Sequence, residues 1–524
     1  MSDKVAAAPS AVFTQDAGNK LAVSMAKNSA IVFIGGILGR VLQFLLQIVL
    51  GRLLGPGGFG NYVLGLSFVD IGKTVAGLGL DRAGVRYAAI FLGENQPERA
   101  ARLVRLSLGL SVLTGAFFGA TLYFLAPLAT SYFQNPESAR VIQLFAIGLP
   151  FAVVAFVASG LVRGANKMAL DMAVTDIGQP LLNLAVLVGL ALMSSRDLRA
   201  TIIALNISLV AAAAISVGAL IKVFPTALRR VQLPRLDIQP ILSYSAYMML
   251  ISICTVAMFR VDKLVLGGLV AATQVGIYGA SSMISQQNAL VILAINKAFS
   301  PRVATLYHQG EHHQLDYLFK MLNRWSTATT FPLMLVSILL SREILGVMGP
   351  KFVDGWLVLA VMSFGQFTNA STGSAGVFLN MSGHQRLDLI NLVITIILDV
   401  VLILVLTPQL GVLGAAIAFA VATAVINLAR LIEVYRLTGI QPYDPKLVPV
   451  FLSGGATLAI WLLIDQIVPW QGFVKLIVGA LTLTGIYAII LLKWGLQAED
   501  RKIIRSFMAR LQPASAKFLA RWSR

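Results

Sequence analysis

Three charged residues lie inside a stretch that is otherwise apolar. Arg260, Asp262 and Lys263 fall within residues 241–270, a stretch long enough for a membrane helix, which needs about 20 apolar residues. A charge near the centre of a bilayer costs roughly 2.5–3.5 kcal/mol on insertion scales, so three neighbouring charges must pair or face a wet cavity. Charges buried in a membrane usually mark the path of a substrate or an ion. The stretch is therefore a candidate binding site.

Two further cations, Arg40 and Lys73, are embedded in apolar segments nearer the N-terminus. Together with Arg260 and Lys263 they predict a cavity with a cationic lining, which suits an anionic ligand. Arginine is especially suited to phosphate, because its planar fork donates two parallel hydrogen bonds.

Polar residues recur at helical spacing in several apolar segments, so they share helix faces. Because polar groups cannot face lipid cheaply, we expect them to line the same cavity. The alternative for each residue is a hydrogen bond between neighbouring membrane helices. The predicted lining residues are Gln43, Gln47, Asn183, Ser285, Gln366 and Asn369.

Three acids, Asp70, Asp262 and Asp399, also lie in apolar segments. An acid in such a setting favours neutralisation by a proton or pairing with a cation, so these are candidates for coupling to H⁺ or Na⁺. An alternative for Asp70 is a structural pair with Lys73, one helical turn away. Asp262 and Lys263 are adjacent and point about 100° apart, which predicts other partners for both. An alternative for Arg260 is neutralisation of Asp262.

No sequence pattern for catalysis is found. The GxxxxGK[ST] phosphate loop, a Ser/His/Asp set and a metal-ligand set are all missing, which argues against an enzyme and against a cofactor or metal. His308, His312 and His313 cluster in HQGEHHQ, but no carboxylate or thiol set completes a metal site there, so a solvated loop is expected.

The composition identifies the class of protein. Of 524 residues, 57% are hydrophobic and 12% charged, and the mean hydropathy is +0.81, which is typical of an all-α polytopic membrane protein. The net charge of +18 does not indicate a nucleic-acid partner, because Lys and Arg gather in short connections on one side, as the positive-inside rule requires. Few cations, among them Arg52, Arg342 and Lys475, fall on the other side. The single cysteine, Cys254, excludes an internal disulfide.

Hydropathy predicts about 14 transmembrane helices with both termini in the cytoplasm. The longest connection, residues 299–325, is expected to lie on the membrane surface. The predicted parts are a cytoplasmic tail (1–28), an N-lobe of six helices (29–224), a C-lobe of six helices (238–437), two more helices (448–493) and a basic amphipathic tail (494–524).

An internal repeat relates the two lobes. Leu50, Gly51, Leu53, Gly60 and Tyr62 each recur at an offset of 216 (266 − 50). Since each copy holds an even number of helices, the copies should share one orientation and be related by an axis along the membrane normal, with a site between them.

The chain resembles the polysaccharide-transporter, or oligosaccharide-flippase, branch of the multidrug/oligosaccharidyl-lipid/polysaccharide (MOP) superfamily. The resemblance is carried by GRLLGPGGFGNY (51–62), GLGLDRAGVRYAA (77–89), RVDKLVLGGLVAATQVGIYGA (260–280) and GHQR (383–386). It implies two six-helix lobes in a V plus two extra helices. It also implies alternating-access transport of an undecaprenyl-diphosphate-linked oligosaccharide, such as an O-antigen or exopolysaccharide unit, across the bacterial inner membrane. The implied partners are this substrate, membrane lipids, a polysaccharide polymerase and a chain-length regulator.

Three alternatives remain open. One is a lipid II-type flippase, and another is an ion-coupled multidrug antiporter of the same fold. The antiporter is disfavoured by the four cations and the two extra helices. The third is a membrane-embedded sugar polymerase or ligase, a class that usually needs a large outer loop.

Overall fold

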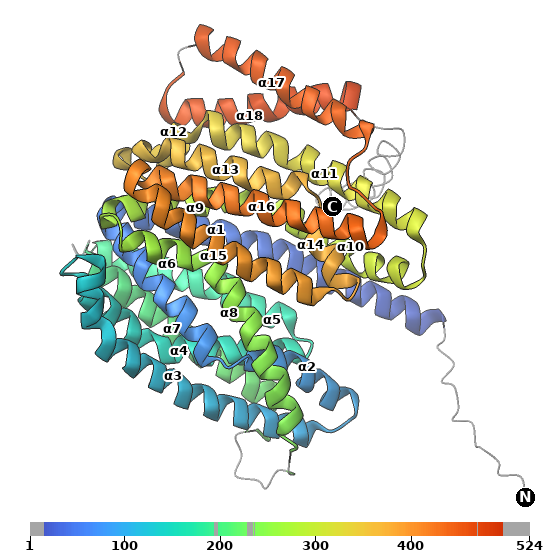
Figure 1. Ribbon diagram of the computed structural model, residues 1–524. Helices are drawn as coiled ribbons and strands as arrows, with labels where there is room; N and C mark the ends of the chain where they lie inside the picture. The colour runs from blue at the N-terminus through green and yellow to red at the C-terminus, as the bar shows by residue number, and fades with distance from the viewer. Residues whose placement is uncertain (1–14, 193–196, 228–233, 235, 469, 496–524) are drawn as a thin grey trace, which may run out of the picture. The chain divides into compact units, whose positions relative to one another are not determined.

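The computed structural model describes residues 15–192, 197–227, 234, 236–468 and 470–495. Within these residues the chain is helical and contains no strand, which confirms the predicted all-α class. The α-helices (Figure 1) are α1 (Gln15–Ala76), α2 (Leu80–Gly93), α3 (Pro97–Phe133), α4 (Ser138–Gly164), α5 (Met168–Met172), α6 (Gln179–Leu192), α7 (Leu198–Val223), α8 (Gln239–Gly267), α9 (Ala272–Gln287), α10 (Leu290–His308), α11 (His312–Leu339), α12 (Ser341–Met348), α13 (Trp356–Ser371), α14 (Ala375–Met381), α15 (Gln385–Leu410), α16 (Val412–Thr438), α17 (Val448–Ile467) and α18 (Gly472–Ile490).

Short helical segments of other types join these elements. Their bounds are η1 (Ala173–Gly178) and η4 (Leu491–Gly495), which are π-helical, and η2 (Pro350–Gly355) and η3 (Pro445–Leu447), which are 3₁₀-helical.

Ten helices of the described chain are long and apolar enough to cross a membrane, or eleven if the bent pair α11 and α12 is one span. The chain is therefore a multi-pass membrane protein, but the expected count of about 14 is not confirmed. One reason is that α1 runs through two predicted spans without a break. It only kinks at Gly55, which has a positive φ of 62° and is followed by Pro56. Another is that α9 and α13 have 16 residues each, short of the roughly 20 that cross a bilayer.

The expected connection at 299–325 is mostly helical, and its place on the membrane surface stays a prediction. Helix α10 continues to His308 and α11 begins at His312, so only a short turn separates them. Both helices bury apolar side chains in one cluster, which includes Leu306, Leu315 and Phe319. The amphipathic pattern therefore reflects a helix pair with a packed face.

The chain forms two compact units. Unit 1 comprises residues 1–49, 72–126 and 142–252, and unit 2 comprises residues 50–71, 127–141 and 253–524. The lobe boundaries expected from the sequence stay a prediction. Helix α1 begins at Gln15, within the segment expected to be an N-terminal tail. The expected basic tail at 494–524 lies outside the described residues, apart from its first two.

Helices α2 and α4 of unit 1 pack closely through small residues. Gly160 and Gly164 of α4 are four residues apart and lie against the backbone of α2. A Cβ atom on Gly164 would stand 2.6 Å from the carbonyl oxygen of Gly84, so only glycine fits. Small residues spaced in this way are a standard means of joining membrane helices, where burial of apolar surface supplies little attraction.

Unit 2 contains an aromatic core. The ring of Phe331 in α11 stacks on Tyr487 of α18, with centroids 5.9 Å apart, and meets Phe367 of α13 edge-on at 5.0 Å. Trp461 of α17 is fully buried against Leu340 and Leu483. The C-terminal pair α17 and α18 thus packs on α11 and α12 (Figure 1).

Candidate ion and substrate site

Helix α8 buries an ion pair between adjacent residues. The Lys263 ammonium lies 2.9 Å from Oδ2 and 3.2 Å from Oδ1 of Asp262, and it also donates to the Phe259 carbonyl at 3.0 Å. Asp262 is 3% exposed and Lys263 is 4% exposed. A charge pair buried this deeply persists only when further hydrogen bonds satisfy the remaining donors and acceptors.

Tyr278 of α9 supplies such a bond. Its hydroxyl donates to Oδ2 of Asp262 at 2.9 Å, and the Lys263 ammonium stands 5.6 Å from the centre of its ring. Tyr278 is fully buried. The tyrosine of the repeated Gly-x-Tyr motif therefore completes the polar site on α8, a role that the sequence analysis missed.

The expectation that Asp262 and Lys263 need other partners is wrong. Their Cβ atoms do diverge along the helix, but the lysine stem is long enough to bring its ammonium back to the carboxylate. The backbone amide of Lys263 also donates to Oδ1 of Asp262, at 2.8 Å.

Arg260 is paired with Asp70. Its Nη2 atom lies 2.5 Å from Oδ2 of the carboxylate, which joins α8 to α1 inside unit 2. The Arg260 side chain remains 27% exposed, against 13% for Asp70. Arg260 thus has an acidic partner on a different helix from the one considered in the sequence analysis, and it keeps an accessible face.

Asp399 of α15 lies in the electrostatic field of the same group, since it interacts with Asp262 and Lys263. Its Oδ1 atom is buried and, within the described residues, accepts no hydrogen bond. We call Asp70, Arg260, Asp262, Lys263, Tyr278 and Asp399 the charged cluster. All six belong to unit 2, so the structure brings together the three predicted coupling acids and two of the four predicted cations.

The other predicted cations, Arg40 and Lys73, belong to unit 1. Arg40 is exposed and Lys73 is half-buried. The expectation that they share a cavity with Arg260 stays a prediction.

The predicted polar lining is divided between the units. Gln43 and Gln47 lie in unit 1, as does Asn183, which is buried. Unit 2 contains the buried Ser285 and Gln366 and the half-buried Asn369. Ser285 donates to the Ser282 carbonyl of its own helix, at 2.9 Å, so this bond does not join neighbouring helices, and a lining role for Ser285 stays a prediction.

A second, half-buried polar group was missed by the sequence analysis. Arg430 of α16 donates from Nε to Oδ1 of Asp388 in α15 at 2.7 Å, and Asn380 of α14 donates to the other oxygen at 2.8 Å. In unit 1, Arg163 meets Asp171 at 3.4 Å. The two aspartates each stand in the first turn after a glycine-containing turn, and that recurrence was the available signal.

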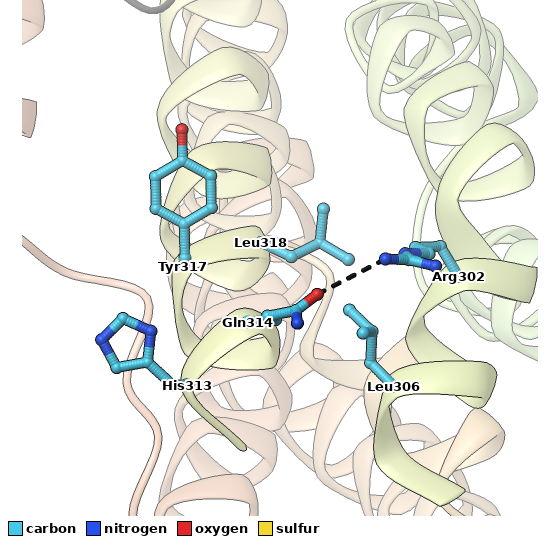
Figure 2. A pocket seen from close by; sticks show the side chains of 6 residues that line it. All are labelled: Arg302, Leu306, His313, Gln314, Tyr317 and Leu318. Atoms are coloured by element: carbon cyan, nitrogen blue, oxygen red, sulfur yellow. Dashed lines mark hydrogen bonds between the residues drawn. The ribbon is translucent and has the colours of Figure 1, made fainter. Parts of the chain in front are cut away.

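The histidine cluster spans a short turn, and His308, His312 and His313 are all exposed, which confirms the expected solvated segment. Its turn separates α10 from α11, and a hollow of about 360 Å³ lies between these helices (Figure 2). Figure 2 shows Arg302 of α10 pointing toward Gln314 of α11, with Nη2 and Oε1 3.4 Å apart, and His313 and Tyr317 at the side. No group of three metal-ligating side chains occurs in the part of the chain that the structure describes.

The described chain is a multi-pass bundle of helices, and several solved structures have a similar fold. The lipid II flippase MurJ in an inward-closed conformation matches with a TM-score of 0.70 at 13% identity, over 88% of this chain and 98% of that one. An inward-facing multidrug-resistance MATE transporter of the MOP superfamily matches at 0.60 and 15% identity, over 78% and 98%. The Vibrio cholerae MATE transporter VcmN in its bent form matches at 0.55 and 14% identity, over 80% and 98%. These likenesses show that the chain shares its fold with these proteins.

The chain belongs to the family of polysaccharide biosynthesis proteins, whose model matches residues 49–357. This confirms the resemblance recognised in the sequence. No curated protein sequence matches.

Proposed function

We propose that the protein is a flippase that moves an undecaprenyl-diphosphate-linked oligosaccharide across the bacterial inner membrane by alternating access, without acting as an enzyme. The family points to polysaccharide biosynthesis, and the fold is one that transporters use. The observation that carries the proposal is the half-accessible guanidinium of Arg260 among apolar membrane helices.

Arg260 has the properties of an exchangeable phosphate ligand. One nitrogen of its fork is held by Asp70, while 27% of the side chain stays exposed. A diphosphate can replace the carboxylate, because a guanidinium donates equally well to both anions. Binding of the diphosphate would then break the ion pair between Arg260 and Asp70.

The pair of Asp262 and Lys263 has a different role in this proposal. Both are almost completely buried, and Tyr278 completes their hydrogen bonding. They hold α8 against α9 and so fix the position from which Arg260 projects. Arg40 and Lys73 are proposed to complete the cationic lining.

The test is flipping of a defined undecaprenyl-diphosphate oligosaccharide in liposomes that contain the purified protein. Arg260→Ala should lose most of the flipping rate, and Arg260→Lys should keep part of it, because an ammonium offers only a point charge. Flipping rates are normalised to the amount of folded protein, because Arg260→Ala removes a cationic partner of the buried Asp70 carboxylate and so lowers stability. The double variant Arg260→Ala/Asp70→Ala separates substrate binding from simple neutralisation: restored flipping would leave Arg260 as scaffold.

The same liposomes distinguish the other candidate substrates. Because a lipid II flippase and multidrug transporters share the fold, lipid II and a cationic dye are the substrates to compare. Transport of the dye without any lipid-linked sugar would replace the proposal with an antiporter.

A further inference from the structure

A group of cations lies at the end of α11 opposite to the histidine turn. The sequence predicts few Lys and Arg residues on that side of the membrane. A hollow of about 490 Å³ opens there among α1, α12, η2 and the start of α18, all within unit 2. Arg52 and Arg342 line it, together with Glu343, Val353 and Phe473. The positive-inside rule does not account for arginine on the side that is poor in cations. Two guanidinium groups at one hollow on that side therefore need another explanation.

Both guanidinium groups are held in place by neighbours that are not acids. The Nε of Arg52 donates to the Val347 carbonyl at 2.7 Å, and the guanidinium carbon of Arg342 lies 4.7 Å from the centre of the Trp356 ring. Among the residues that the structure describes, neither arginine forms an ion pair. The contacts use one N–H of Arg52 and a face of Arg342, so the terminal N–H groups remain for a ligand.

The acid at the hollow already has a cationic partner. Lys475 of α18 lies 3.5 Å from Oε1 of Glu343 and 2.7 Å from Oδ1 of Asp465 in α17. This arrangement ties the C-terminal helix pair to α12. Lys475 offsets only one of these two acids, so with both arginines included the group keeps one net positive charge.

The rim of the hollow is apolar. Phe473 is 65% exposed at its edge, and Val353 lies beside it. The exposed phenylalanine places an apolar edge next to the two guanidinium groups. Oriented guanidinium groups next to such a rim suit an amphiphile that carries a phosphate.

We propose that this hollow binds the phosphate of a lipid headgroup through Arg52 and Arg342. The planar fork of each arginine matches two phosphate oxygens, and pre-orientation reduces the entropy lost on binding. The site is separate from the charged cluster, so it does not depend on the flippase proposal.

The experiment measures affinities of the full-length protein in detergent by thermophoresis. The probes are dihexanoyl phosphatidic acid, dihexanoyl phosphatidylcholine and inorganic phosphate. The variant Arg52→Gln/Arg342→Gln should weaken phosphatidic acid binding at least ~10-fold, and Arg342→Lys should weaken it less, because it keeps the charge without the fork. The matched control Arg140→Gln/Lys351→Gln removes the same charge from residues that do not line the hollow, and it should change the affinity less than ~2-fold.

The probes also identify the source of the phosphate. Saturable binding of phosphatidic acid that inorganic phosphate does not displace supports a lipid headgroup, and displacement at equal concentration assigns the same arginines to soluble phosphate. Equal losses in the control and the Arg52/Arg342 variant would overturn the site, as would unsaturable binding to the unmodified protein. Size-exclusion elution and melting temperature without ligand confirm that each variant is folded.

Discussion

Gly60 and Gly276 pack against each other in a reciprocal contact. A Cβ atom on Gly60 would overlap the carbonyl oxygen of Ala272, and one on Gly276 would overlap the carbonyl oxygen of Pro56. Pro56 and Ala272 are themselves separated by the repeat offset of 216 (272 − 56). The contact therefore maps onto itself when the two copies are exchanged, as a local two-fold axis requires. Superposition of residues 29–222 on 241–433 by rotation about the membrane normal stays a prediction.

Alanine at either glycine should separate α1 from α9. We expect Gly60→Ala and Gly276→Ala each to cost about 1–3 kcal/mol, because the colliding atoms belong to backbone and cannot turn away. Melting temperatures in detergent measure the effect. Gly485→Ala is the control, since a Cβ atom there meets nothing within 4 Å. Equal melting temperatures for all three variants would contradict the close approach.

Lys263→Met should be among the most damaging changes to the charged cluster. It leaves the Asp262 carboxylate buried without its cation, which typically costs about 3–5 kcal/mol. Adding Asp262→Asn to Lys263→Met should recover much of that loss. Tyr278→Phe removes one hydrogen bond to a charged group and should cost about 1.5–3 kcal/mol.

The control for Lys263→Met is Lys320→Met. Lys320 meets Asp316 at 2.7 Å on the same helix, with both side chains partly exposed, so its loss should cost less than about 1 kcal/mol. Thermal denaturation of the four variants in one detergent makes the comparison. If Lys263→Met and Lys320→Met have the same melting temperature, the Asp262–Lys263 pair is not buried as described.

Asp399 is the acid best placed to couple transport to an ion. Its Oδ1 atom is buried and accepts no hydrogen bond within the described residues, and the carboxylate lies in the field of Asp262 and Lys263. We expect Asp399→Asn to remove the dependence of flipping on pH or Na⁺ in liposomes. Asp316→Asn, on a partly exposed helix face, should leave that dependence intact. A wild-type rate that ignores pH, Na⁺ and membrane potential would rule out coupling.

Asp81 should make stability depend on pH. It lies at the start of α2, a helix of 14 residues that does not count among the candidate spans. Burial raises the pKa of this carboxyl above its usual 3.8, and the guanidinium of Arg82 offsets the shift only in part. The folded protein therefore binds this proton more tightly than the unfolded chain, and its contribution to stability is lost as pH rises from about 4 through the raised pKa.

The measurement is the melting temperature of the wild type and Asp81→Asn across that pH range. The gain from Asp81→Asn should grow as pH rises, because asparagine cannot ionise. Glu94→Gln at the other end of α2 controls for the loss of one negative charge. If the gain in melting temperature shrinks as pH rises, the pKa of Asp81 is lowered in the folded protein and the prediction is wrong.

The sequence by itself determined the helical class and most helix positions, because a bilayer demands long apolar segments with internally satisfied backbones. Residues 241–268 were expected as a span, and α8 occupies Gln239–Gly267. Repeated glycine spacing likewise identified Gly60 and Gly276, since a contact that excludes every side chain restricts the residue type. Hydropathy joined shorter helices, because it averages over about 19 residues. The span expected at 274–298 covers α9 and the first part of α10.

Only the tertiary structure decided the partners of the charges. Asp70 precedes Arg260 by 190 residues (260 − 70), and no local pattern relates them. The pair of Asp262 and Lys263 depended on the path of a flexible lysine stem, which helical angles between Cβ atoms do not determine. The hollow at Arg52 and Arg342 arises where α1, α12 and α18 converge. Side-chain conformation and long-range packing set these contacts, and both follow from the whole folded chain.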